Sequence, residues 1–349
     1  PDEWAMYTDL AVNELLPRLR GEILLSSKRY HYIAKKLKTI VEASSLALGK
    51  HAARSTFVPV GLELDFGRGK TLPPLVFPVN EDLTMEIAGR IDRVDCAQGE
   101  QGLLLRVIDY KSSQTPLRLA EIYHGLSLQL ITYLDIVVTF AEDWLGKPAL
   151  PAGALYFHVH NPMLKTSNGY PSEKAREEWL KRFKMQGLVL KDRDVVRCMD
   201  TALDKGYSPL IPVAVKTDGD FYKQSAVYTQ KQWEQLKQKN RRRILQLGKR
   251  MSGGAVEIRP YRLGSKTPCA FCPYKAICQF DPQYAENDFA FLPALNQEEV
   301  WERLSRETDE QNENARHPEA AQHLTLGRER EMNRLTDERG ASEAMEVEP

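Results

Sequence analysis

The sequence predicts an α/β fold in which a mixed β-sheet is flanked by helices. Two expected strands, residues 85–94 and 103–111, are joined by a polar, glycine-rich stretch that is typical of a hairpin loop. Residues 103–111 are almost continuously apolar, which is the pattern of a strand buried on both faces. Helically spaced apolar residues before and after this hairpin predict the helices that would cover the sheet.

The expected hairpin brings charged residues together at one end. If it folds symmetrically about its loop, Asp92 lies opposite Asp109. Side chains alternate along a strand, so Asp109 and Lys111 point to one face and Tyr110 to the other. Two neighbouring carboxylates repel each other and are costly to bury unpaired, and a divalent cation such as Mg²⁺ or Mn²⁺ would remove both problems.

Two interpretations of these charges remain open. In the structural one, Asp92 pairs with Arg90 or Arg93 on a solvated hairpin, and Asp109 only ends a strand beside Lys111. In the catalytic one, a bound cation activates a water, and Lys111 positions or helps to deprotonate that water. The catalytic interpretation is favoured because the D-x-K follows an apolar strand and a second Asp reaches the same place.

Composition limits the class of protein. The chain has 349 residues with 42% hydrophobic and 28% charged side chains, as in globular proteins, and its formal net charge is zero. A nucleic-acid role would therefore need a local basic face. We find no apolar run of membrane-spanning length and no signal-peptide pattern, and the clustered cysteines indicate a metal site in a reducing compartment rather than a disulfide framework. The first residue is Pro inside an expected helix, so we expect part of a longer polypeptide.

The N-terminal region predicts two helices, over residues 4–19 and from a cap at Ser26-Ser27 onward, followed by strands 58–66 and 75–79. Glu63 lies on the first of these strands, where it is either a solvent-facing residue or a carboxylate near the metal. Downstream of the hairpin, a helix is expected over residues 122–140. Its Gln129 and Tyr133 are one turn apart and share a face, which is either an ordinary polar edge or part of the site.

Strand 152–160 carries His158 and His160 on one face, and we interpret them as satisfied strand histidines rather than ligands. Residues 161–220 are expected to form a helical insertion that contains Lys165 as a candidate phosphate contact, a charged helix over 173–185 and a bend at 187–190. A helix over residues 228–250 turns basic toward its end. Its charges fit a solvated face and a contact with DNA phosphates equally well.

Three cysteines, Cys269, Cys272 and Cys278, place three thiolates within ten residues, which favours zinc or an iron–sulphur cluster. Both metal groups take four protein ligands. Cys96, expected in the hairpin turn, and Cys198 are better explained as small buried residues than as the fourth ligand. Beyond about residue 305 the chain is polar, and we expect it to be disordered or a loose helix.

The segments GRIDRVD and VIDYKSS, residues 89–95 and 107–113, resemble the core of the PD-(D/E)xK nucleases of the RecB type. Gln129 and Tyr133 match the Q-x-x-x-Y helix motif of that family. The cysteine spacing is similar to the C-terminal half of the iron–sulphur staple in the subset that includes the AddAB helicase–nucleases. The resemblance covers most of residues 1–300.

The resemblance implies a restriction-endonuclease-like fold and metal-dependent hydrolysis of DNA phosphodiesters. By this resemblance Asp92 and Asp109 would bind Mg²⁺ with the Tyr110 carbonyl, and Lys111 would orient the nucleophile. The residues with supporting roles would be Gln129, Tyr133 and Glu63.

A [4Fe–4S] cluster held by Cys269, Cys272 and Cys278 would take its fourth cysteine from a position upstream of the nuclease core, which this chain lacks. The family's G-x-x-x-H motif is also not found, because His51 in Gly49-Lys50-His51 has the wrong spacing. These two absences could leave the chain inactive. The implied partners are DNA and an AddA-like helicase–nuclease subunit in a heterodimer that processes double-strand breaks for recombinational repair.

The expected organisation is a nuclease domain over residues 1–300, with the insertion at 161–220 and the cysteine cluster at 269–278, followed by a polar tail over 301–349. No G-x-x-x-x-G-K-[ST] motif occurs, so the chain is not expected to hydrolyse ATP itself. Two alternatives remain: a stand-alone Cas4-like exonuclease, and a catalytically idle DNA-binding module with a structural metal cluster.

Overall fold

The computed structural model describes residues 2–19, 21, 23–100, 102–164, 172–284 and 287–316. Lys165 and the tail residues 317–349 lie outside the described residues. The chain divides into two units, Pro1–Leu295 and Asn296–Pro349. The described part of the second unit is the helix α10 (Gln297–Arg316), and the first unit contains all other elements described below.

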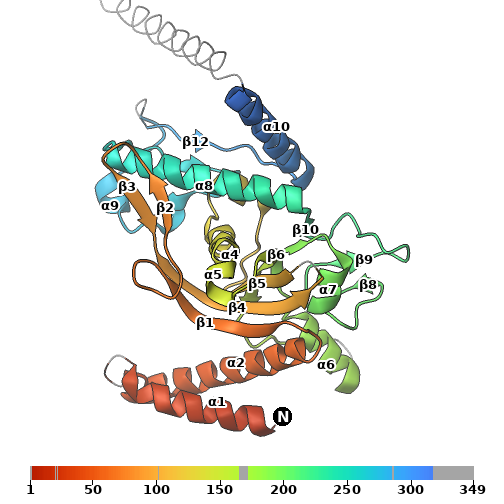
Figure 1. Cartoon of the computed structure of the whole chain (residues 1–349). Coiled ribbons are helices and arrows are strands. Elements are labelled where there is room, and N and C mark those ends of the chain that lie inside the picture. Colours follow the sequence, from red (N-terminus) through yellow and green to blue (C-terminus); the bar gives the residue numbers. More distant parts are fainter. Residues whose placement is uncertain are drawn as a thin grey trace, which may run out of the picture. The chain divides into compact units, whose positions relative to one another are not determined.

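The centre of the first unit is a six-stranded mixed sheet with the strand order β1-β4-β5-β6-β7-β10 (Figure 1). These strands are β1 (Val58–Phe66), β4 (Gly89–Gly99), β5 (Gly102–Lys111), β6 (Ala149–His158), β7 (Gln186–Leu190) and β10 (Val227–Tyr228). Neighbouring strands run antiparallel except in the β5–β6 and β7–β10 pairs, which are parallel. The predicted mixed sheet flanked by helices is therefore confirmed.

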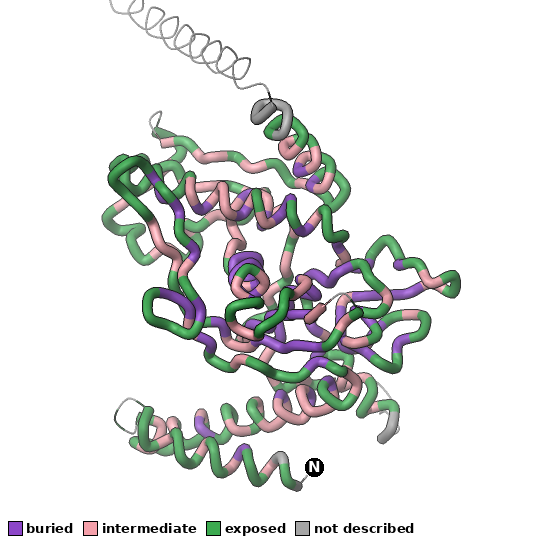
Figure 2. The backbone as a smooth tube through the Cα atoms, in the orientation of Figure 1, coloured by how far each residue is buried: buried purple, intermediate pink, exposed green. Residues whose placement is uncertain are grey.

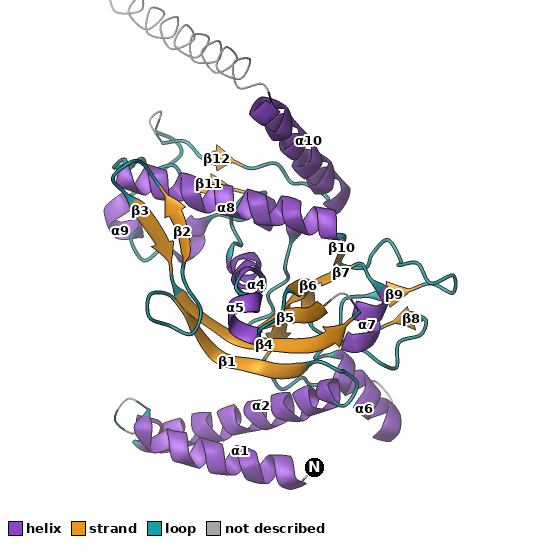
Figure 3. Cartoon of the chain, in the orientation of Figure 1, coloured by secondary structure: helices purple, strands orange, loops and turns teal. Residues whose placement is uncertain are grey.

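Helices cover both faces of this sheet (Figure 3). On one side lie α1 (Asp2–Leu15) and α2 (Lys28–Ala52); on the other lie α4 (Gln129–Thr139) and α8 (Gln230–Ser252). The sequence explains where the long helices begin. The Ser27 hydroxyl accepts a hydrogen bond from the Tyr30 amide, and Thr229 forms a capping box with Gln232.

Buried residues concentrate in the central strands and in α4, which packs over β5 and β6 (Figure 2). The remaining helical elements are short: η1 (Leu16–Arg18), η2 (Ile23–Leu25), α3 (Leu119–Tyr123), α5 (Ala141–Leu145), α6 (Ser172–Lys181), α7 (Arg193–Met199), η3 (Pro268–Phe271) and α9 (Lys275–Cys278). The remaining strands form two-stranded pairs: β2 (Leu75–Pro78) with β3 (Thr84–Ile87), β8 (Gly206–Tyr207) with β9 (Ala214–Val215), and β11 (Tyr261–Arg262) with β12 (Ala290–Phe291). Among the helices described here, none has the length and apolar character needed to cross a bilayer.

The predicted strand over residues 85–94 is wrong, because β3 and β4 are two separate strands. The break falls where Gly89 pairs with Phe66 of β1, and a Cβ on Gly89 would lie 3.0 Å from the Phe66 ring. At the other end of β4, Gly99 pairs with Gly102 of β5. Cys96 is therefore a buried residue of β4 rather than part of the turn.

The predicted helix over residues 122–140 is interrupted, and α4 begins at Gln129. The interruption contains Gly125, whose φ of +78° is left-handed and whose added Cβ would meet the Arg243 side chain of α8 at 2.6 Å. The predicted bend at 187–190 is also wrong, because these residues belong to β7. The region 161–220 is therefore not purely helical, since it contributes one strand to the central sheet.

Candidate active site

Strand register places one row of polar side chains across the sheet. Arg93 of β4 pairs with Ile108 of β5, so the next step of the same register sets Asp92 opposite Asp109. Asp109 is the partner of Tyr156 on β6, and Tyr156 is the partner of Gln186 on β7. Paired residues point to the same side of a sheet, so this row lies on the face covered by α4.

Asp109 is the most buried carboxylate of this row, at 2% exposure. Its Oδ2 forms an ion pair of 2.6 Å with Lys111 Nζ but makes no hydrogen bond of standard geometry within the described residues. Burial raises the pKa of Asp109, Lys111 partly opposes this rise, and the charge of Asp92 adds to it. Asp92 Oδ2 accepts a hydrogen bond of 2.8 Å from the Tyr110 amide, which fixes this carboxylate against the end of β5.

Lys111 connects the carboxylates to α4. Its Nζ donates to Gln129 Oε1 at 3.2 Å, and Gln129 Nε2 donates in turn to Tyr133 Oη at 2.9 Å. The same ammonium lies 5.3 Å from the centre of the Tyr156 ring. Burial lowers the pKa of Lys111, but the pairing with Asp109 outweighs burial and the net shift is upward. Lys111 is thus held as a cation, which suits charge stabilisation better than proton abstraction.

Glu63 lies apart from this network. The β1–β4 register sets it between Leu62 and Leu64, opposite Asp92, but its side chain is 67% exposed. Within the described residues its one ion pair is a contact of 3.7 Å with Arg90. Glu63 has a φ of +48°, which is a strained left-handed conformation for a residue with a Cβ. The structure therefore brings Asp92, Asp109, Lys111, Gln129 and Tyr133 together but leaves Glu63 at the rim.

The arginines that could have paired with Asp92 have other partners. Arg90 Nε lies 2.7 Å from Asp65 Oδ1, and Arg93 Nε lies 2.6 Å from Asp95 Oδ1. Asp95 belongs to the opposite face of the sheet, the face covered by α2. The structural interpretation of Asp92 as an arginine partner on a solvated hairpin is therefore wrong.

His51 of α2 also lies on that opposite face. Its ring packs edge-on against Phe157 at 5.9 Å, and it is 5% exposed. Burial, followed by the positive charges of Arg106 and other arginines, lowers the pKa of His51 to about 3. His51 is therefore a neutral core residue, away from the row that contains Asp109.

Much of the basic run on α8 serves packing. Arg241 Nε pairs with the buried Asp135 at 2.6 Å, Arg243 Nη2 donates to the His124 carbonyl at 3.0 Å, and Lys239 lies over the Tyr123 ring at 4.3 Å. These contacts hold α8 to α4 and to α3 with the residue after it, and they account for three of the basic residues. A contact of the other basic residues with DNA phosphates stays a prediction.

The three clustered cysteines are half-buried free thiols: Cys269 lies in η3, Cys272 directly after it, and Cys278 in α9. Their donor chemistry fits a thiolate-bound metal. In the part of the chain that the structure describes, however, no three His, Cys, Asp or Glu side chains converge as a ready metal site. Asp92 and Asp109 likewise supply only two side-chain ligands and so do not form such a group of three in the described residues.

Sequence reasoning missed Tyr156, which lies beside Asp109 and Lys111. The signal that could have found it is its place in a strand that pairs in register with β5.

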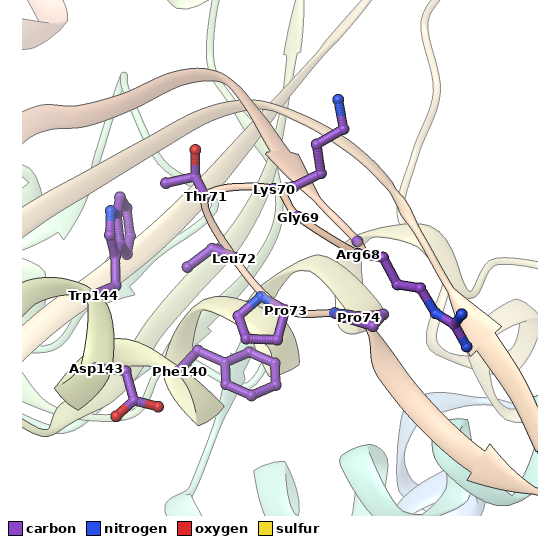
Figure 4. A pocket seen from close by; sticks show the side chains of 11 residues that line it. Arg68, Gly69, Lys70, Thr71, Leu72, Pro73, Pro74, Phe140, Asp143 and Trp144 are labelled. Atoms are coloured by element: carbon purple, nitrogen blue, oxygen red, sulfur yellow. The ribbon is translucent and has the colours of Figure 1, made fainter.

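A cavity of about 300 Å³ lies elsewhere, between the turn at residues 67–74 and α5, where Phe140, Trp144, Pro73 and Pro74 provide apolar walls (Figure 4). None of the predicted site residues lines it.

The structure thus combines a mixed sheet with a central hairpin that presents Asp92, Asp109 and Lys111 on the face covered by α4. The family profile described as "PD-(D/E)XK nuclease superfamily" matches residues 4–279, and the chain belongs to this superfamily.

The chain is also similar to individual curated proteins. The chain is 46% identical over 308 residues to an ATP-dependent helicase/deoxyribonuclease subunit of Bacillus subtilis (strain 168), which covers 88% of this chain and 26% of that protein. It is 45% identical over 309 residues to the protein of the same name in Bacillus pumilus (strain SAFR-032), with the same coverage of 88% and 26%. The chain thus spans about a quarter of the length of these relatives.

Proposed function

We propose that this chain is a metal-dependent DNA exonuclease domain that acts within an AddAB-type helicase–nuclease during double-strand break processing. The observation that carries the proposal is the position of Asp92 opposite Asp109, with Lys111 bridging from Asp109 to Gln129. The name of the relatives, which includes deoxyribonuclease, supports DNA as the substrate.

Asp92, Asp109 and the Tyr110 carbonyl are the oxygen ligands that we assign to a divalent cation. The fit rests on the position of Asp92 opposite Asp109 and on Asp109 Oδ2, a buried oxygen whose partner among the described residues is the Lys111 ammonium at 2.6 Å. Mg²⁺ or Mn²⁺ bound there would supply an activated water and a Lewis acid for a phosphoryl oxygen.

The protein's own residues would position the reaction. Lys111, held as a cation, would orient the nucleophile and offset the negative charge that develops on the phosphate. Gln129 fixes the Lys111 ammonium through its Oε1 and is itself held by Tyr133. Glu63, at the rim and opposite Asp92, would act on a metal-bound water rather than on the metal itself.

For the C-terminal segment we propose a structural [4Fe–4S] cluster on Cys269, Cys272 and Cys278, with a fourth cysteine from outside these 349 residues. The support is the C-x2-C-x5-C spacing, and iron analysis with the absorption spectrum of the purified protein tests it. We also propose residues 1–300 as the nuclease domain, 301–349 as a separate tail, an AddA-like subunit as the partner and the bacterial cytoplasm as the location.

The test is hydrolysis of linear single-stranded DNA with Mg²⁺ or Mn²⁺, comparing the wild type with Asp109→Ala and Lys111→Ala. We expect cleavage by the wild type that a chelator abolishes and that both variants lose. Asp143→Ala, an exposed carboxylate on α5, is the control and should retain activity. A folded wild type that is inert with both metals would contradict nuclease activity in this chain.

A further inference from the structure

A second polar cavity, of about 220 Å³, opens directly beside the candidate active site. It shares Lys111 and Tyr156 with that site and extends across the sheet to Gln186 of β7. It therefore continues the row that begins with Asp92 and Asp109, on the side away from β4. Its remaining wall comes from His158 of β6, from the end of α6 with the segment that follows it, and from the loop after β5.

The cavity is strongly basic. Lys111, Lys181, Arg182 and Lys184 line it, and none of its described lining residues is acidic. Lys181 has a partner outside the cavity lining, Glu178, at 2.7 Å. Lys184 differs, because it is half-buried and burial alone lowers its pKa, with no carboxylate acting in the opposite direction. An anion bound beside this partly desolvated ammonium would stabilise its charged form, and among the described lining residues none supplies such a charge.

The backbone around Lys184 is held on both sides. Phe183 is 1% exposed and stacks on Phe157 of β6 with ring centres 5.9 Å apart. Met185 is also 1% exposed, and its amide donates to the Leu210 carbonyl at 2.8 Å. With both neighbours anchored in the core, Lys184 is presented to the cavity from a fixed backbone, which reduces the entropy lost when a ligand binds.

Size limits what the cavity can hold. Pockets for whole small molecules occupy roughly 300–1,000 Å³, and this cavity of about 220 Å³ is smaller. A phosphate group with part of its sugar fits this volume better than a complete nucleotide. Ser113 and Thr115 add hydroxyl groups to the lysine donors, which matches the several acceptor oxygens of a phosphate.

We propose that this cavity is a phosphate subsite, in which Lys184 binds a DNA backbone phosphate next to the one that is hydrolysed. The inference rests on the proposed nuclease function, since the scissile phosphate must lie at Asp109 and Lys111. The subsite fixes how the DNA strand lies across β5, β6 and β7. It places the neighbouring DNA phosphate on the β7 side of the phosphate that reacts.

The test combines a protein change with a substrate change. Oligonucleotides that each carry one uncharged methylphosphonate, at successive positions flanking the cleaved bond, are digested by the wild type and by Lys184→Met. At one flanking position we expect the wild type to lose roughly tenfold in kcat/KM, as for one charged hydrogen bond. Lys184→Met should show this loss on the normal substrate and no further loss with that methylphosphonate.

Two further variants control for folding and for general charge. Lys184→Arg keeps the cation and should retain most activity and the methylphosphonate effect. Lys191→Met removes a lysine just after β7 that does not line the cavity, and it should behave like the wild type. If the decreases in kcat/KM caused by Lys184→Met and by the methylphosphonate are independent, and so multiply, at every position, the subsite is overturned. Cleavage of DNA in the same experiment would still support the proposed nuclease function.

A binding experiment covers the case in which the chain does not cleave DNA. Binding of single-stranded DNA without metal is measured over a range of salt concentrations. Loss of one phosphate contact lowers the slope of log K against log salt by about 0.7. We expect this decrease for Lys184→Met and not for Lys191→Met, and equal slopes for the wild type and Lys184→Met would overturn the subsite.

Discussion

The two faces of the β4–β5 hairpin carry similar charged residues but satisfy them differently. On the α2 face, Asp95 is fully buried and both its oxygens are bonded, by Arg93 at 2.6 and 3.0 Å and by Arg106 at 3.0 and 2.9 Å. On the α4 face, Asp109 has one ion pair, and its Oδ2 lacks a regular hydrogen bond within the described residues. A closed charge network stabilises a fold, whereas a buried carboxylate with spare acceptor capacity can bind a reactant.

The largest expected effect is on DNA hydrolysis and comes from changing Asp109, on the face of the sheet covered by α4. Asp109→Ala should lower DNA hydrolysis by roughly 10³-fold, because it removes an assigned metal ligand and the partner of Lys111. Burial raises the pKa of Asp109, so holding its ionised form in the fold has a cost that the pair with Lys111 partly offsets. Urea unfolding without metal should therefore find that this variant loses much less stability than Asp95→Ala. A large loss of stability would make Asp109 a structural residue like Asp95.

On the face covered by α2, a change is expected to lower stability rather than activity. Asp95→Ala should destabilise the protein by about 3–5 kcal/mol, because it leaves Arg93 and Arg106 buried without their anion. Urea unfolding measures this loss, and activity should fall only as far as the folded fraction falls. Asp65→Ala, which breaks a more exposed pair with Arg90, is the matched control and should destabilise the protein far less than Asp95→Ala.

Acid should also destabilise the α2 face through His51. Its pKa of about 3 in the folded state lies below the usual 6.5, so the unfolded chain takes up the proton first. The stability that His51 provides is complete above pH 6.5 and is lost as the pH falls toward 3. Between pH 6.5 and 5 this loss is about 2 kcal/mol.

His51→Phe should remove that part of the pH dependence, since Phe can pack on Phe157 without titrating. The measurement is the free energy of unfolding in urea at several pH values between 6.5 and 5. Parallel curves for the wild type and the variant would show that folding does not lower the pKa of His51. A loss of hydrolysis at pH 7 in a stable variant would instead assign His51 to the reaction.

The contrast between the two faces was partly predictable from sequence. Alternation along residues 103–111 assigns Asp109 and Lys111 to one face, and the hairpin brings in Asp92, so a local pattern contains the site. The close approach of Arg243 to Gly125 in the helix break was not predictable, because Arg243 is distant in sequence. Tyr156 and the basic cavity were missed for the same reason, since strand pairing between β5, β6 and β7 brings their residues together.

The smallest expected effect concerns Glu63, at the rim of the open face. Glu63→Gly should raise the free energy of unfolding by about 1 kcal/mol, because Gly adopts a φ of +48° without the strain of a Cβ. Hydrolysis should fall in the same variant if the carboxylate acts on a metal-bound water. Glu63→Gln separates the two effects, because it keeps the strain and removes the charge. A stabilised Glu63→Gly with full activity would show that Glu63 has no part in the reaction and would limit the site to Asp92, Asp109, Lys111 and the residues of α4.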